Sequence, residues 1–140
     1  MSETPPLSRR LAAEALGTTL LVTVGTGCVM TNVIAQGALG LTGIALTWGF
    51  LVTALIATIG GISGAHINPA VTVALTVTGK FPAREAGPYI AAQCAGASLG
   101  SLILLATLGN VSNLGMTLPT VSVGAALAIE HSLLLAQELA

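Results

Sequence analysis

Two long stretches of this 140-residue chain contain no charged side chain. The four basic and five acidic residues leave the chain uncharged from Ala15 to Gly79 and from Ala86 to Ile129. Roughly a quarter of the residues of an ordinary soluble domain are charged, whereas here the charged fraction is 6% and the mean hydropathy is +0.93. Both stretches are therefore predicted to lie in lipid, as parts of an all-α integral membrane protein.

Four segments are long enough to cross a hydrocarbon core of ~30 Å, which takes about 20 helical residues. They are expected at residues 11–33, 41–60, 86–108 and 122–139. Residues 61–78 are also apolar, but they contain Gly61, Gly64 and Pro69 and are too short for a further span. We interpret them as a re-entrant segment, which enters the membrane partway and returns to the same side.

The basic residues are expected on one side of the membrane. Two precede the first span, and two lie between the re-entrant segment and the third span; they are Arg9, Arg10, Lys80 and Arg84. The loops on the opposite side carry no charge, so the positive-inside rule places the polar tail, residues 1–10, in the cytoplasm. We expect a plasma membrane or a cell inner membrane.

Several functions are disfavoured by the same composition. Four basic residues cannot form a patch that neutralises a run of phosphates, so no nucleic-acid partner is expected. Cys28 and Cys94 lie within apolar stretches and are expected as packing residues, and no metal or other cofactor is predicted. His66, His131 and Glu130 lack any metal-ligand or nucleophile–base spacing, so the chain is not expected to be an enzyme.

The string SGAHINPAVT, residues 63–72, predicts a short helix. Asn68 is a favoured N-cap, and Pro69 suits the first helical position because the N–H that it lacks would be unpaired there. A helix over residues 68–77 would be about 15 Å long. It would therefore reach only halfway through the membrane, with its positive N-terminal end near the midplane.

The residues before this helix, Gly64, Ala65 and His66, are then expected as extended backbone at membrane depth. Such backbone is tolerated only where it is buried in protein or lines a water-filled cavity. A row of carbonyl acceptors followed by the Asn68 amide could carry water or a polyol past an apolar wall, and the positive helix end would oppose protons and cations.

This string resembles the signature of the major intrinsic protein family, which comprises the aquaporins and glycerol facilitators. The resemblance covers about residues 10–130, in four blocks: AEALGTTLLVTVGTG (13–27), TWGFLVTALIATIGGISGAHINPAVTVAL (47–75), GKFPAREAGPYIAAQCAGA (79–97) and GAALAIE (124–130). It implies the family's first inverted repeat, three spans with a re-entrant half-helix, followed by a fourth span. It also implies a passive channel for water or small neutral solutes such as glycerol, and a homo-oligomer, usually a tetramer.

The resemblance implies roles for individual residues of the re-entrant segment. The positions that match the family's pore are Gly64, Ala65, His66, Asn68, Pro69 and Ala70. Asn68 resembles the first pore asparagine, which donates its amide to the permeating molecule. The three residues from Gly64 resemble the carbonyl ladder that leads to it, and for His66 we expect only the backbone to be functional, with a packed imidazole.

Two further residues match the family outside this segment. Glu14 is unfavourable within a span unless it is paired, and its family counterpart accepts backbone N–H bonds from the re-entrant loop; the alternative is a glutamate that reaches the membrane interface. Trp48 resembles a residue of the selectivity constriction near the outer mouth. Tryptophan there is similar to glycerol facilitators and to the nodulin-like plant branch, and the alternative is an ordinary interfacial tryptophan.

The chain departs from the family by containing one repeat and a fourth span, where the family pore has two inverted repeats. The second Asn-Pro-Ala and the arginine after it are missing. Glu130 matches Glu14, but His131 and Glu138 do not fit the family. Two interpretations stay open: a channel that lacks the second half of its pore, or a truncated, non-conducting protein that at most associates with full-length subunits. Two antiparallel copies would need both orientations, which the one-sided basic residues disfavour.

Overall fold

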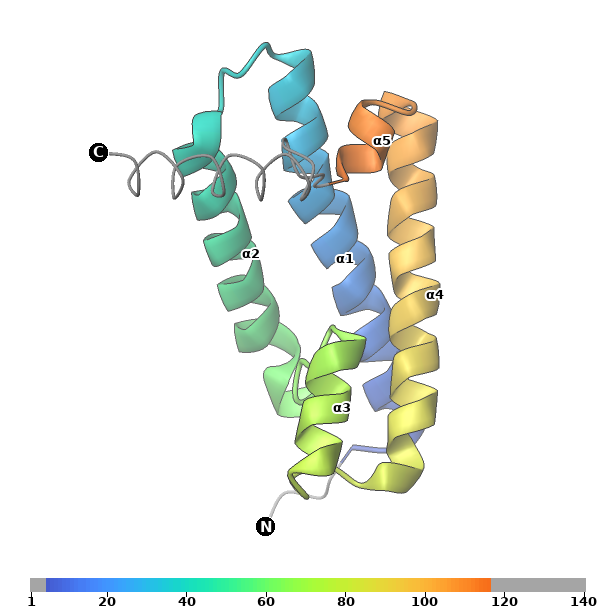
Figure 1. Ribbon diagram of the computed structural model, residues 1–140. Helices are drawn as coiled ribbons and strands as arrows, with labels where there is room; N and C mark the ends of the chain where they lie inside the picture. Colours follow the sequence, from blue (N-terminus) through green and yellow to red (C-terminus); the bar gives the residue numbers. More distant parts are fainter. Residues whose placement is uncertain (1–4, 117–140) are drawn as a thin grey trace, which may run out of the picture.

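The computed structural model describes residues 5–116, which form a bundle of helices (Figure 1). The elements are α1 (Leu7–Ile34), α2 (Gly40–Ser63), α3 (Pro69–Val77), α4 (Ala83–Leu108) and α5 (Ser112–Gly115). Three of them, α1, α2 and α4, are long and apolar enough to cross a membrane. This confirms an all-helical membrane fold. The expected fourth span at 122–139, with Glu130, His131 and Glu138, lies outside the described residues.

The long helices extend slightly beyond the predicted spans because of the residues at their ends. α1 begins at Leu7 directly after Pro6, and α4 begins at Ala83 directly after Pro82. Proline is well tolerated at helix starts, since a backbone N–H is not needed there. α2 continues to Ser63 and stops at Gly64, whose left-handed φ of 89° is a common helix end.

The re-entrant connection between α2 and α3 differs from the expected extended backbone. Gly64, Ala65 and Ile67 have φ values of 89°, 49° and 42°, so the expectation was wrong for the first two of these residues. Asn68, directly before α3, is extended, with φ −156° and ψ 128°. Residues 64–68 turn the chain back from the end of α2 before α3 begins (Figure 1), and such a short reversal needs left-handed backbone.

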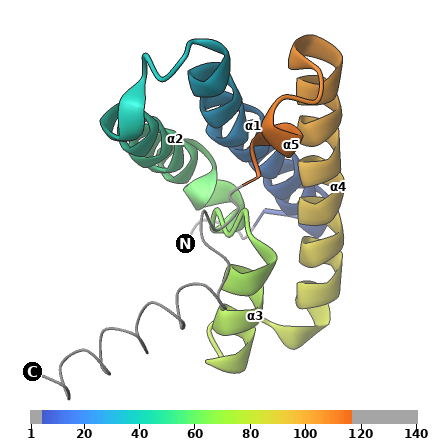
Figure 2. The ribbon, with the colours of Figure 1, turned by 45° about the horizontal axis from the view of Figure 1, so that its top comes forward.

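α1 lies at the centre of the bundle, packed against α2 on one side and α4 on the other (Figure 1 and Figure 2). A Cβ on Gly100 would lie 2.8 Å from the Thr19 carbonyl oxygen, and one on Gly96 would collide with the Ala15 backbone. The Thr19 hydroxyl donates to the Gly96 carbonyl at 3.1 Å. Small residues thus bring α1 and α4 into backbone contact, a common basis of helix association in lipid.

α2 has little burial in the part of the chain that the structure describes. Its buried residues are Leu55 and Ser63, while apolar side chains such as Leu41 and Phe50 are 84% and 71% exposed. α3 packs against α4 (Figure 1). The α1–α4 side of the bundle is therefore closely packed, and the α2 side is open and apolar.

Candidate functional site

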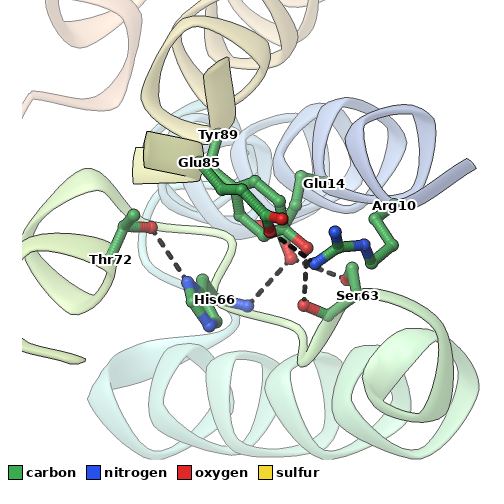
Figure 3. A network of polar contacts seen from close by, with 7 residues as sticks. All are labelled: Arg10, Glu14, Ser63, His66, Thr72, Glu85 and Tyr89. Atoms are coloured by element: carbon green, nitrogen blue, oxygen red, sulfur yellow. Dashed lines mark hydrogen bonds and ion pairs between the residues drawn. The ribbon is translucent and has the colours of Figure 1, made fainter. Parts of the chain in front are cut away.

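Glu14 is fully buried on α1 and accepts four hydrogen bonds. Its Oε1 accepts from the Ser63 hydroxyl at 2.6 Å and the His66 backbone N–H at 3.0 Å. Its Oε2 accepts from the Ile67 backbone N–H at 2.6 Å and the Gln93 amide at 2.8 Å. A carboxylate offers about four acceptor positions, and all are used here. Figure 3 shows the carboxylate between Ser63 and the His66 N–H, where α1 meets the re-entrant connection.

Thr72 extends these contacts to α3. Its hydroxyl oxygen accepts from the Gln93 amide at 2.9 Å. The same oxygen lies 3.1 Å from the His66 Nδ1, a contact drawn in Figure 3. Thr72 and Gln93 are both 0% exposed. We call Glu14, Ser63, His66, Thr72 and Gln93 the Glu14 network. It joins α1, α2, α3 and α4 through one buried carboxylate, so the start of α3 is fixed relative to all three long helices.

The His66 imidazole is packed as well as hydrogen-bonded. Its ring centroid lies 4.7 Å from that of Phe81 and 5.2 Å from that of Tyr89. The Tyr89 hydroxyl donates to the Ser63 carbonyl at 3.0 Å, which satisfies one of the free carbonyls at the end of α2. Aromatic packing and hydrogen bonding therefore hold the same short connection.

An ion pair joins the first turns of α1 and α4 close to this network. The Arg10 guanidinium lies 2.7 Å from Glu85 Oε2, and its centre is 5.9 Å from the Tyr89 ring (Figure 3). The two side chains are 14% and 13% exposed. Arg10 is therefore paired within the bundle, whereas Arg9, Lys80 and Arg84 are exposed.

Asn68 is the N-cap of α3 and is exposed. Its Oδ1 accepts the Ala70 backbone N–H at 2.8 Å, and Pro69 occupies the first helical position. With the oxygen end of the amide held by the helix, the Nδ2 group is the part left to donate to a solute. The sequence thus produces a fixed hydrogen-bond donor at the positive end of a nine-residue helix.

Asn68 lies on the wall of an apolar recess between α1, α2 and the re-entrant connection. The recess has a volume of about 350 Å³ and is lined by Leu21, Trp48, Val52, Ile56, Ala65, His66, Ile67, Asn68 and Val71. It brings together four of the predicted site residues, Trp48, Ala65, His66 and Asn68. Gly64, Pro69 and Ala70 are not among the lining residues; they shape the turn and the first turn of α3.

Four side chains of this site were missed by the sequence analysis: Ser63, Thr72, Tyr89 and Gln93. Gln93 carried a usable signal, because an amide in an uncharged span needs hydrogen-bond partners in the same way as Glu14. Thr72 carried none, since threonines throughout these helices donate to their own helix backbone; Thr18 and Thr47 do so at 2.8 Å.

Sequence similarity identifies relatives of this chain among known proteins. The family model described as "Major intrinsic protein" matches residues 1–137. A probable aquaporin AqpM of Archaeoglobus fulgidus is 43% identical, over 90% of this chain and 60% of that protein. A probable NIP-type aquaporin of Nicotiana alata is 42% identical, over 87% and 45%. Aquaporin AqpM of Methanothermobacter marburgensis is 42% identical, over 81% and 54%.

The chain spans about half the length of the curated relatives that it matches. The family match covers nearly the whole chain, including the re-entrant connection, α3 and the recess. By its sequence match, and by its three apolar helices and the half-length helix that follows the re-entrant connection, this chain belongs to the major intrinsic protein family.

Proposed function

We propose that this chain forms half of the wall of a passive transmembrane channel for water or small neutral solutes such as glycerol. The observation that supports this best is the position of Asn68, an exposed amide at the N-terminus of α3 on the wall of an apolar recess. The similar proteins are named as aquaporins, which favours the same solute class.

In this proposal Asn68 is the hydrogen-bond donor to the passing solute. Its Oδ1 is held by Ala70, so Nδ2 replaces one of the solute's water contacts. Val52 and Ile56 offer no hydrogen bonds on the facing wall, so the solute is not bound tightly enough to be retained. The positive end of α3 raises the energy of a cation at the same point. Transport is passive, and no catalytic step is involved.

Glu14 and the re-entrant backbone support this donor. Four hydrogen bonds to the Glu14 carboxylate fix the connection that leads to Asn68. Carbonyls of Gly64, Ala65 and His66 act as acceptors on the path to it, with the His66 imidazole serving as packing. Trp48 forms part of the constriction at the other end of the recess, and its broad apolar face suits the carbon chain of a polyol.

The orientation and assembly follow the same proposal. Arg9 and Arg84 lie in the first turns of α1 and α4, and Lys80 lies in the connection between α3 and α4. These exposed cations are on one side of the bundle, which favours a cytoplasmic N-terminus in a plasma or cell inner membrane. The assembled channel is a homo-oligomer, a tetramer as is usual in the family.

Stopped-flow light scattering on proteoliposomes tests the proposed function. Vesicles that contain the 140-residue chain are challenged with an impermeant osmolyte and then with glycerol. Flux above that of empty liposomes is expected, and Asn68→Asp should reduce it because the substitution removes the Nδ2 donor. Asn32→Asp is the matched control: Asn32 uses Oδ1 to accept from Leu39 and Gly40 in the opposite loop, away from the recess.

The two outcomes separate the channel from its alternative. Flux that Asn68→Asp lowers and Asn32→Asp leaves unchanged supports the channel. Flux equal to that of empty liposomes, with the chain inserted and helical, contradicts conduction by this chain and favours a non-conducting protein that associates with complete subunits.

A further inference from the structure

The indole of Trp48 lies directly against Gly25 of α1. A Cβ on Gly25 would lie 2.5 Å from Cη2, 2.6 Å from Cζ2 and 2.9 Å from Cζ3 of the ring. Gly25 is buried and Trp48 is half-buried. No side chain fits at residue 25 while the indole stays where it is. Because glycine is less favourable than alanine inside a helix, its presence here is explained by this close approach.

The same indole forms one wall of the recess that contains Asn68. Trp48 and Leu21 both line the recess, and Leu21 precedes Gly25 by one turn on the same face of α1. The ring therefore has α1 behind it and the recess in front of it. Any group that pushes the ring away from α1 moves it into the recess.

We propose that Gly25 is a specificity-determining position, because its missing side chain lets Trp48 lie back against α1 and keeps the recess wide. This inference rests on the proposed function, since it concerns the width that the recess offers to a solute. Carbon atoms in contact are ~3.5–4.0 Å apart, so a methyl group at residue 25 would move the ring by about 1 Å. Such a narrowing affects a polyol more than the smaller water molecule.

Tryptophan fluorescence reports the position of the ring, since Trp48 is the single tryptophan of the chain. Gly25→Ala should shift its emission maximum and increase its quenching by acrylamide, because the ring moves from α1 into the recess. Gly49→Ala is the matched control. Gly49 lies in the same helix next to Trp48, and a Cβ there meets nothing within 4 Å, so emission and quenching should stay as in the unsubstituted chain.

Flux measurements on proteoliposomes, as used to test the proposed function, report the width of the recess. The ratio of glycerol to water permeability should fall severalfold in Gly25→Ala and stay unchanged in Gly49→Ala. The fall should disappear when Gly25→Ala is compared within a Trp48→Phe background, because phenylalanine lacks the outer indole atoms that meet residue 25. This double-mutant comparison isolates the contact between the two positions.

The outcomes are distinct. The proposal would be overturned if Gly25→Ala showed the same emission and quenching as Gly49→Ala. It would also be overturned if the ring moved but the ratio of glycerol to water permeability stayed unchanged, or if that ratio fell equally in the Trp48→Phe background. If Gly25→Ala does not fold, recovery of helical circular dichroism in Gly25→Ala/Trp48→Phe supports the contact, and no recovery overturns it. Absence of flux in the unsubstituted chain contradicts the proposed function and the claim about width, while fluorescence still decides whether Gly25 positions Trp48.

Discussion

The two sides of α1 differ in the polarity of the side chains that pack there. Toward α3 and α4, the buried side chains are polar and their hydrogen bonds are satisfied by one another: Glu14, Thr72 and Gln93 are all 0% exposed. Toward α2, the walls are apolar, and a recess of about 350 Å³ stays open between the helices. His66 is the member of the Glu14 network that also lines this recess; the Glu14 carboxylate and the other members of the network lie away from it.

This separation has a physical reason. An unpaired polar group at membrane depth costs several kcal/mol, so the donors of a non-helical connection need fixed acceptors. Placing a carboxylate behind the connection satisfies the N–H groups of His66 and Ile67 from α1. The opposite wall then needs no strong acceptor that would bind a solute.

Glu14→Gln should disrupt the closed side of the bundle, where α1 faces α3 and α4, and should lower the free energy of unfolding more than any of the substitutions that follow. A glutamine keeps one acceptor oxygen but presents an NH₂ group to donors, so about two of the four buried donors lose their partner. Each such loss costs about 1–3 kcal/mol, and the free energy of unfolding should fall by about 2–6 kcal/mol. Thermal unfolding in detergent micelles, followed by circular dichroism, measures this. A change no larger than that of Cys94→Ala, at an exposed position of α4, would contradict the account.

Gln93→Leu should have the next largest effect, because Gln93 donates to both Glu14 and Thr72. Leucine has a similar size but removes both contacts and leaves buried acceptors short of a donor, at about 1–3 kcal/mol. The same unfolding experiment applies. Additive losses in Gln93→Leu/Glu14→Gln would argue against one coupled network, since residues that share contacts show non-additive effects.

Tyr89→Phe should destabilise the protein by about 1 kcal/mol. It removes the hydrogen bond to the Ser63 carbonyl and leaves the ring packed against His66 and Phe81. Chemical unfolding in detergent resolves a difference of this size. A loss as large as that of Glu14→Gln would mean that the ring packing had also changed.

Ile56→Ala tests the open side and should have the smallest effect. Ile56 lines the recess and is 53% exposed in the bundle, so the loss should stay below the 2–5 kcal/mol of a buried isoleucine, at about 1 kcal/mol or less. Leu104→Ala is the control on the closed side, where Leu104 is 3% exposed. Equal losses in the two variants would contradict the difference between the sides.

The sequence predicted those features that depend on local pattern. The uncharged stretches located the three long helices, and Asn68 followed by Pro69 located α3. The left-handed turn at Gly64 and Ala65 was not foreseen, because it follows from how few residues reconnect α2 to α3. The pattern of apolar residues does not show how far apart the end of α2 and the start of α3 lie, so it cannot predict the backbone conformation of the residues that join them.

The hydrogen-bond partners of Glu14 could not be predicted from the sequence, for a related reason. Ser63 and Gln93 are 49 and 79 residues from Glu14, and their meeting depends on how α1, α2 and α4 pack. The contact of Trp48 with Gly25 is likewise a product of packing. Gly96 and Gly100, four residues apart on α4, form the small-residue face that α1 occupies.

Two neighbouring positions of α3 allow the most direct test of the difference between the two sides. Val71 lines the recess and is 42% exposed, while Thr72 is buried in the Glu14 network. Cysteine is introduced at each position after Cys28 and Cys94 are replaced by alanine, and reaction with a water-soluble thiol reagent is measured in proteoliposomes. The account predicts rapid modification of Val71→Cys and none of Thr72→Cys. Equal rates, or no reaction at Val71→Cys, would contradict a water-accessible recess beside a sealed network.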